Sequence, residues 1–129
     1  MERLKHVLAG ISIVAVGLGL LLDHLATLIL VDLLGSTAPA GPAGLLILAA
    51  LGATCTVFGG YAAARVAGRL ELEHAALVGV GGIVIGAVMA PSVGAAMPLW
   101  YTTAAFLLVL PAALLGGQIA RHGARVDGK

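Results

Sequence analysis

The most constraining feature of this chain is the placement of its positive charges. Four long hydrophobic segments alternate with short polar stretches, and every Lys and Arg lies before the first segment, between the second and third, or after the fourth. These residues are Arg3, Lys5, Arg65, Arg69, Arg121, Arg125 and Lys129. The other two connections contain no Lys or Arg. Because cytoplasmic loops of membrane proteins carry the excess of these residues, we expect both termini and the middle connection to face the cytoplasm.

The four segments predict four membrane-spanning helices, over residues 7–34, 44–64, 74–90 and 99–120. About 20 helical residues, at about 1.5 Å each, suffice to cross a hydrocarbon core of about 30 Å. The first segment exceeds this length and that of a signal-peptide apolar region, so we expect it to stay uncleaved and to tilt or project outward. Only 10% of the residues are charged, against about 25% in a soluble domain. The prediction is an all-α integral membrane four-helix bundle, one domain built from two tandem transmembrane hairpins.

Aromatic residues and prolines agree with this topology. Trp100 and Tyr101 lie at the outer end of the fourth segment and Tyr61 near the inner end of the second, where aromatic belts are expected. Pro91 is predicted to end the third helix. Pro111 lies inside the fourth segment, where a proline is tolerated and usually kinks the helix.

The cytoplasmic arginines follow a repeated pattern. An Ala-Arg-x-x-x-Arg motif ends the second segment at 64–69 and recurs after the fourth at 120–125. An ancient duplication of the hairpin and a chance match in Ala/Gly-rich sequence both explain the repeat. We expect the four arginines of these motifs to set the topology and to contact anionic headgroups of the lipid bilayer, the main partner. They are Arg65, Arg69, Arg121 and Arg125.

Small residues at four-residue spacing predict close helix packing. In lipid, helices associate through close backbone approach and interhelical hydrogen bonds, and small residues permit both. The predicted packing residues are Gly52, Thr56 and Gly60 in the second segment, Gly82 and Gly86 in the third, and Gly116 in the fourth. Packing within one bundle accounts for such rows, and so does a homo-oligomer that uses one of them.

The candidate polar site within the membrane consists of Asp23, His24 and Thr27. An intramembrane carboxylate costs about 2.5–3.5 kcal/mol at a helix centre and is therefore a functional hypothesis by default. Counted from Val7, Asp23 lies about 24 Å along the helix, in its outer third. The alternative is that a long, tilted helix places Asp23 and His24 among the outer headgroups. Burial of Asp23 in a cavity with a polar neighbour would favour ion or proton binding.

Other chemistry has little support in the sequence. Three histidines, His6, His74 and His122, are expected at the cytoplasmic surface near acidic residues, but without the tight spacing of metal ligands. We therefore predict no metal site. Catalytic motifs and phosphate- or dinucleotide-binding fingerprints are absent from the sequence, so we predict no cofactor and no enzyme activity. A net charge of +1 without a basic stripe points to no nucleic-acid partner.

Three stretches carry a family resemblance. GGYAAARVAGRLELEHAALVG at 59–79, PLWY at 98–101 and PAALLGG at 111–117 resemble small, uncharacterised four-helix bacterial integral membrane proteins. The shared features are a Gly-Gly-aromatic helix end, an Ala-x-Arg exit, a short charged loop and a His that opens the next helix. The resemblance implies a multi-pass protein of the bacterial cytoplasmic (inner) membrane and implies no activity. Asp23 and His24 lie outside it.

Two functions follow from these patterns. The first is a non-enzymatic accessory or oligomeric component that acts through helix packing. The alternative is a small proton- or cation-coupled transporter that uses Asp23, with a small-molecule ligand that the sequence does not specify.

Overall fold

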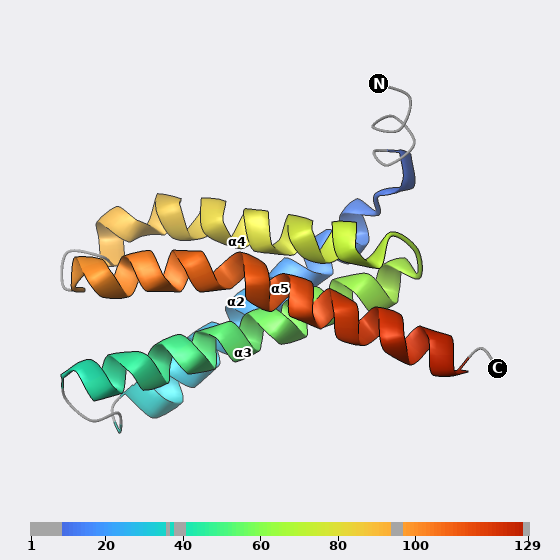
Figure 1. Ribbon diagram of the computed structural model, residues 1–129. Helices are drawn as coiled ribbons and strands as arrows, with labels where there is room; N and C mark the ends of the chain where they lie inside the picture. The colour runs from blue at the N-terminus through green and yellow to red at the C-terminus, as the bar shows by residue number, and fades with distance from the viewer. Residues whose placement is uncertain (1–8, 36, 38–40, 94–96, 128–129) are drawn as a thin grey trace.

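Four long helices make up the computed structural model, which describes residues 9–35, 37, 41–93 and 97–127. They are α2 (Ile13–Gly35), α3 (Pro42–Ala67), α4 (Glu71–Val93) and α5 (Leu99–Asp127). All four are long and apolar enough to cross a membrane. The predicted all-α four-helix membrane bundle is confirmed (Figure 1).

The first helix is shorter than predicted. Residues 9–10 are helical, residues 11–12 are not, and α2 begins only at Ile13, while residues 7–8 lie outside the described part of the chain. Ser12 ends the break as an N-cap, because its Oγ accepts the backbone N–H of Ala15 at 3.2 Å. With 23 residues, α2 is about 34 Å long, close to the roughly 30 Å of a bilayer core. This helix therefore matches the membrane without the projection that the sequence suggested.

The turn between α3 and α4 is set by two left-handed residues. Gly68 has φ 63° and donates its N–H to the carbonyl of Ala64, a C-cap that glycine adopts without steric cost. Leu70, at φ 51°, is unusual for a non-glycine residue. Its carbonyl oxygen accepts two hydrogen bonds from His74, one from the backbone N–H at 3.0 Å and one from the ring Nδ1–H at 2.8 Å. These two bonds hold the turn in its strained conformation.

The later helices run beyond their predicted ends. α4 begins at Glu71, three residues before the predicted start, with Glu71 and Glu73 in a first turn where acidic side chains are favourable. It also continues past Pro91 to Val93, so the predicted stop at the proline is wrong. α5 contains Pro111 and extends to Asp127, with Arg125 in the last turn, where a cation complements the helix dipole.

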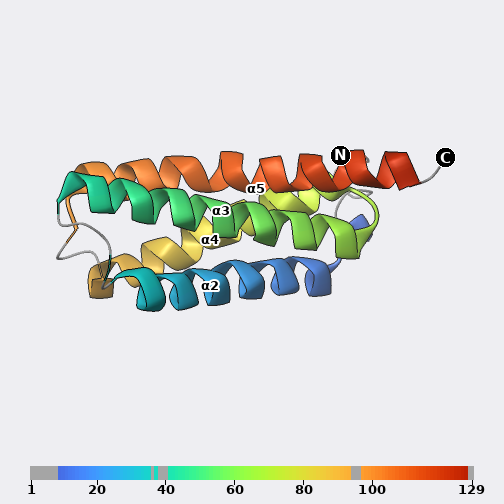
Figure 2. The same ribbon diagram turned by 90° about the horizontal axis from the view of Figure 1, so that it is seen from below.

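The helices pack as two hairpins that converge at one end. α3 contacts the other three helices, whereas α2 and α5 occupy opposite corners of the bundle. Figure 1 shows the α2–α3 and α4–α5 pairs diverging toward the end where α2 and α4 finish. Figure 2 shows α3 and α5 side by side, in agreement with their having the most extensive contact of any pair.

Glycines permit the close approach in the converging half. A Cβ atom on Gly59 of α3 would lie 2.7 Å from the carbonyl oxygen of Gly19 on α2, closer than real Cβ contacts allow. A Cβ on Gly60 would overlap the backbone of Ala113 on α5, and one on Gly116 would overlap the backbone of α3. The backbones of α2, α3 and α5 therefore touch there with no side chain between them.

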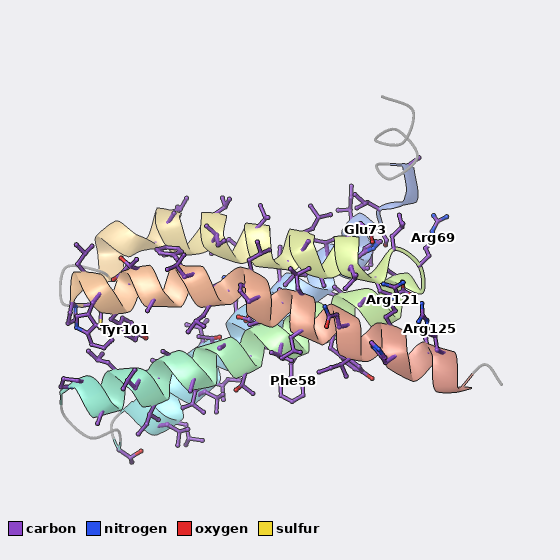
Figure 3. All side chains as sticks on the ribbon, viewed as in Figure 1. Phe58, Arg69, Glu73, Tyr101, Arg121 and Arg125 are labelled. Atoms are coloured by element: carbon purple, nitrogen blue, oxygen red, sulfur yellow. The ribbon has the colours of Figure 1, made fainter. Side chains whose placement is uncertain are left out.

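The two ends of the bundle differ in chemistry. Arg69, Arg121, Arg125 and Glu73 lie together at the converging end, and Tyr101 lies at the opposite end (Figure 3). We call these the cationic end and the aromatic end. Tyr101 makes an edge-to-face contact with Trp100, at 6.0 Å between ring centroids. The charge asymmetry of the sequence is thus an asymmetry of the folded molecule.

Candidate functional site

Asp23 lies in the interior of the bundle, halfway along α2. Its residue exposure is 5%, so the side chain is packed inside the bundle and does not face outward. Asp23 is about 15 Å from the first residue of α2 and about 18 Å from the last. The sequence placed it in the outer third only because the helix was counted from Val7, before the break at residues 11–12. The break shortens the span and moves the carboxylate to its midpoint.

Thr56 on α3 holds one oxygen of this carboxylate. Its Oγ1 donates to Asp23 Oδ1 at 3.0 Å and lies 3.2 Å from the carbonyl oxygen of Gly52, so the one hydroxyl proton has two acceptors within reach. Thr56 is also only 5% exposed. The missing side chain of Gly59 admits Asp23 to this position, because a Cβ there would lie 2.8 Å from the Asp23 Cβ. A residue predicted for helix packing is therefore the partner of the carboxylate.

The other oxygen of Asp23, Oδ2, accepts no hydrogen bond from the residues that the structure describes. The Nδ1 atom of His24 is 3.7 Å away, beyond hydrogen-bond distance, and lies instead 2.9 Å from the carbonyl oxygen of Leu20. Every fully buried side-chain oxygen or nitrogen among the described residues has a hydrogen-bond partner. Since no hydrogen bond to Oδ2 is formed within that part of the chain, this oxygen must be accessible. It is free to accept a hydrogen bond or a positive charge from a ligand.

Asp23 lines a cavity of about 290 Å³ together with residues of all four helices, and Oδ2 is the oxygen on the side of Gly82, which also lines it. The polar lining residues are Asp23, His24, Thr27, Thr56 and Tyr101. The remainder of the wall is apolar or glycine. The three residues of the predicted polar site therefore line one cavity, and the structure adds Thr56 and Tyr101 to them.

A second cavity of about 360 Å³ lies beside the first, toward the aromatic end. The two share Thr27, Gly82, Tyr101, Ala105 and Val109 in their walls. The second adds Thr102 together with the apolar side chains of Met89, Met97 and Phe106. The two spaces are thus neighbours on the side of the aromatic end, while the close glycine contacts fill the half toward the cationic end.

His74 is a buried structural residue that sequence reasoning placed wrongly at the cytoplasmic surface. It is 0% exposed. Its Nε2 accepts the backbone N–H of Ser12 at 2.8 Å, and its Nδ1, which lies 2.8 Å from the Leu70 carbonyl oxygen, donates to it. These partners require a neutral ring with the proton on Nδ1. His74 thus connects the start of α4 to the N-cap of α2, 62 residues away in sequence.

The other histidines lie apart from this site. His122 is exposed and its Nδ1 lies 2.8 Å from the Gln118 carbonyl oxygen, whereas His6 falls outside the described residues. Among the described residues, no group of three His, Cys, Asp or Glu side chains is arranged to hold a metal ion.

The predicted packing residues have three different roles. Gly60 and Gly116 lie at backbone contacts between α3 and α5, and Gly86 lies against the Phe106 ring, 3.0 Å from where its Cβ would stand. A Cβ on Gly82 would be 3.3 Å from the Val109 side chain of α5 and 3.7 Å from Asp23 Oδ2, and one on Gly52 would meet nothing within 4 Å. Both of these glycines line the cavity. Gly82 therefore lies at a contact with α5 as well as beside the carboxylate, whereas Gly52 makes no helix contact.

The four arginines of the repeated motif are all exposed. Arg65 and Arg69 lie around the end of α3, and Arg121 and Arg125 lie in the last turns of α5.

No protein-family model, curated protein or solved structure matches this chain. Because one fold hosts many activities, function has to be argued from the site itself.

Proposed function

We propose that this multi-pass membrane protein is a small proton- or cation-coupled transporter whose binding carboxylate is Asp23. The observation that carries the proposal is the 5% exposure of Asp23 at the midpoint of a membrane span, where the residue lines a cavity. A carboxylate at this depth is costly for a protein that only needs to pack, and such residues mark ion and proton pathways. Binding near the bilayer midplane is also where secondary transporters hold their substrates.

Each polar residue has a role in this mechanism. Asp23 binds the proton or cation through Oδ2, and Thr56 keeps the carboxylate oriented through its bond to Oδ1 at 3.0 Å. Thr27 and Tyr101 line the route from the aromatic end. By the positive-inside rule, the cationic end is cytoplasmic and the cavity opens outward in a bacterial inner membrane. The present arrangement then corresponds to an outward-facing state.

Access from the cytoplasm requires the hairpins to move against each other. Rigid-body rocking of bundles around a fixed site is the usual solution in transporters. The contacts to be broken are those between the two hairpins, Gly60 of α3 with Ala113 of α5 and Gly116 of α5 with Val57 of α3. They lie at glycines, where the backbones of α3 and α5 touch without an intervening side chain. All four helices of one chain line the cavity, so a second copy is not needed to complete the site.

The other function considered from sequence was a non-enzymatic accessory component that binds partners through its small-residue rows. Gly60 and Gly116 are already covered within the chain, and Gly52 and Gly82 line the cavity. The rows therefore offer little surface to a partner, which favours transport.

Flux measurements on reconstituted protein test the proposal. A pH gradient is imposed across proteoliposomes, and Na⁺, K⁺ or an organic monovalent cation is added on the side opposite the excess protons. The decay of the pH gradient is followed with an enclosed pH-sensitive dye. We expect wild-type protein to accelerate the decay and Asp23→Asn to abolish the acceleration. Asp32→Asn is the matched control, because Asp32 lies exposed on the same helix. Equal decay with wild type and Asp23→Asn, or a wild-type rate no faster than empty vesicles, would contradict the mechanism.

A further inference from the structure

We propose that the Asp23 cavity binds an organic ammonium ion, with the charged nitrogen at Oδ2 and the apolar body against α4 and α5. This inference uses the carboxylate of the proposed function and adds the chemical class of its ligand.

The size of the cavity favours a molecule over an inorganic ion. The neighbouring spaces of about 290 Å³ and about 360 Å³ fall in the range that holds small organic ligands. A hard inorganic cation needs several oxygen ligands at short range. Among the described residues that line the cavity, Asp23 supplies the only carboxylate, and the Thr56 hydroxyl proton is already directed to Oδ1 or to the Gly52 carbonyl. A partly apolar cation fits the shape and the chemistry better.

The charge of the lining specifies a cation. Within the part of the chain that the structure describes, neither cavity has a Lys or Arg in its wall, and Asp23 is the one acidic residue there. His24 directs Nδ1 to the Leu20 carbonyl oxygen, 2.9 Å away, so it supplies no hydrogen bond to Oδ2. A single positive charge balances the carboxylate, whereas an anionic ligand would meet it without a counter-charge.

The wall toward the aromatic end suits the apolar part of such a ligand. It includes the rings of Phe106 and Tyr101 and the thioethers of Met89 and Met97. Aromatic faces attract alkylammonium groups, and methionine side chains adapt to ligands of different shape. The contact with Trp100, at an interplanar angle of 89°, helps to orient the Tyr101 ring. Met89, Met97 and Phe106 line the neighbouring space, and Tyr101 lines both this space and the Asp23 cavity.

Two glycines create the space next to the carboxylate. A Cβ on Gly82 would lie 3.7 Å from Oδ2, and a Cβ on Gly52 would stand in the cavity with nothing within 4 Å. A larger side chain at either position would occupy the space of the ligand. At Gly52 it would do so without disturbing a helix contact. Gly17 of α2 is the matched position, because its Cβ would also meet nothing within 4 Å, but on the exposed face.

Equilibrium binding to the purified full-length chain in detergent tests the inference. The probe is radiolabelled benzyltrimethylammonium, and the competitors are its neutral isostere neopentylbenzene and NaCl. We expect saturable binding that neither competitor displaces. Fluorescence of Trp100, the single tryptophan, provides an independent signal, because its ring contacts Tyr101 of the cavity lining.

The variants separate the ligand site from a general effect on folding. Asp23→Asn should weaken binding by about thirtyfold or more, as expected for removing one partner of a buried charge pair. Gly52→Leu should block binding, whereas Asp32→Asn and Gly17→Leu should bind as the wild type does. Circular dichroism and gel filtration check that each variant is folded.

Three results would overturn the inference. The first is the absence of saturable binding to wild type, and the second is displacement by the neutral isostere as effective as by the ammonium compound. The third is unchanged binding in both Asp23→Asn and Gly52→Leu.

The flux assay distinguishes failure of this inference from failure of the proposed function. Asp23-dependent proton flux without ammonium binding would retain the transporter and reject the ligand class. Ammonium binding without flux would retain the site and reject transport.

Discussion

Substituting Gly116 by alanine tests the close packing that seals the cationic half of the bundle. A Cβ on Gly116 would overlap the carbonyl oxygen of Val57 and would lie 2.6 Å from the backbone nitrogen of Tyr61. Both are backbone atoms of α3, so no side-chain rotation relieves the overlap. Because comfortable contacts lie near 3.5 Å, α5 has to move away from α3 by roughly 1 Å.

The magnitude follows from two opposing effects. Overpacking of a well-packed interior costs about 1–3 kcal/mol, and we expect about 3 kcal/mol here because the α3–α5 contact is the most extensive in the bundle. Alanine favours the helix over glycine by about 1 kcal/mol. The free energy of unfolding should therefore fall by about 2 kcal/mol. Gly17→Ala is the control, since it gains the same helix preference and its Cβ meets nothing within 4 Å.

The assay is reversible unfolding in mixed micelles with increasing mole fraction of sodium dodecyl sulfate, followed by circular dichroism. Gly116→Ala should unfold at a lower mole fraction than wild type, and Gly17→Ala at an equal or higher one. Equal stability of the two alanine variants would refute the close backbone contact between α3 and α5.

Three further predictions use other parts of the molecule. His74→Leu should lower the free energy of unfolding by about 1–3 kcal/mol, because the backbone N–H of Ser12 loses its acceptor; unchanged unfolding would argue against that bond. Thr56→Val should reduce Asp23-dependent flux and Thr56→Ser should restore it, since only the hydroxyl holds Oδ1; equal flux in the two variants would exclude this role. In intact cells of a Cys55→Ala background, Arg69→Cys should resist a membrane-impermeant maleimide and react only after lysis, whereas labelling before lysis would reverse the proposed orientation.

The bundle was predictable because membrane insertion depends on properties that single residues carry. Hydrophobicity along four segments and the positions of seven cations were enough to predict the helices and the chemical asymmetry of the two ends. The boundaries were less accurate, because capping depends on local backbone geometry. The Ser12 N-cap, the left-handed Gly68 and the helical residues after Pro91 are all details of this kind.

The candidate site was only partly predictable from the chain. Asp23, His24 and Thr27 could be singled out because ionisable and polar side chains are rare within apolar segments. The four-residue spacing that includes Gly52, Thr56 and Gly60 shows which residues share a face of α3, but not what lies opposite that face. In the folded bundle these three residues line the cavity, hold a carboxylate oxygen and contact α5, respectively.

Depth and burial are properties of the assembled helices, and no local pattern encodes them. Asp23 is central because the chain breaks at residues 11–12, and it is buried because Gly59 lets α2 approach α3. His74 is fully buried at the start of α4 because the N-terminus of α2 packs over it and supplies the Ser12 N–H. Composition and charge order thus direct this chain into a membrane, while contacts between residues far apart in sequence place a carboxylate at the inner end of a cavity.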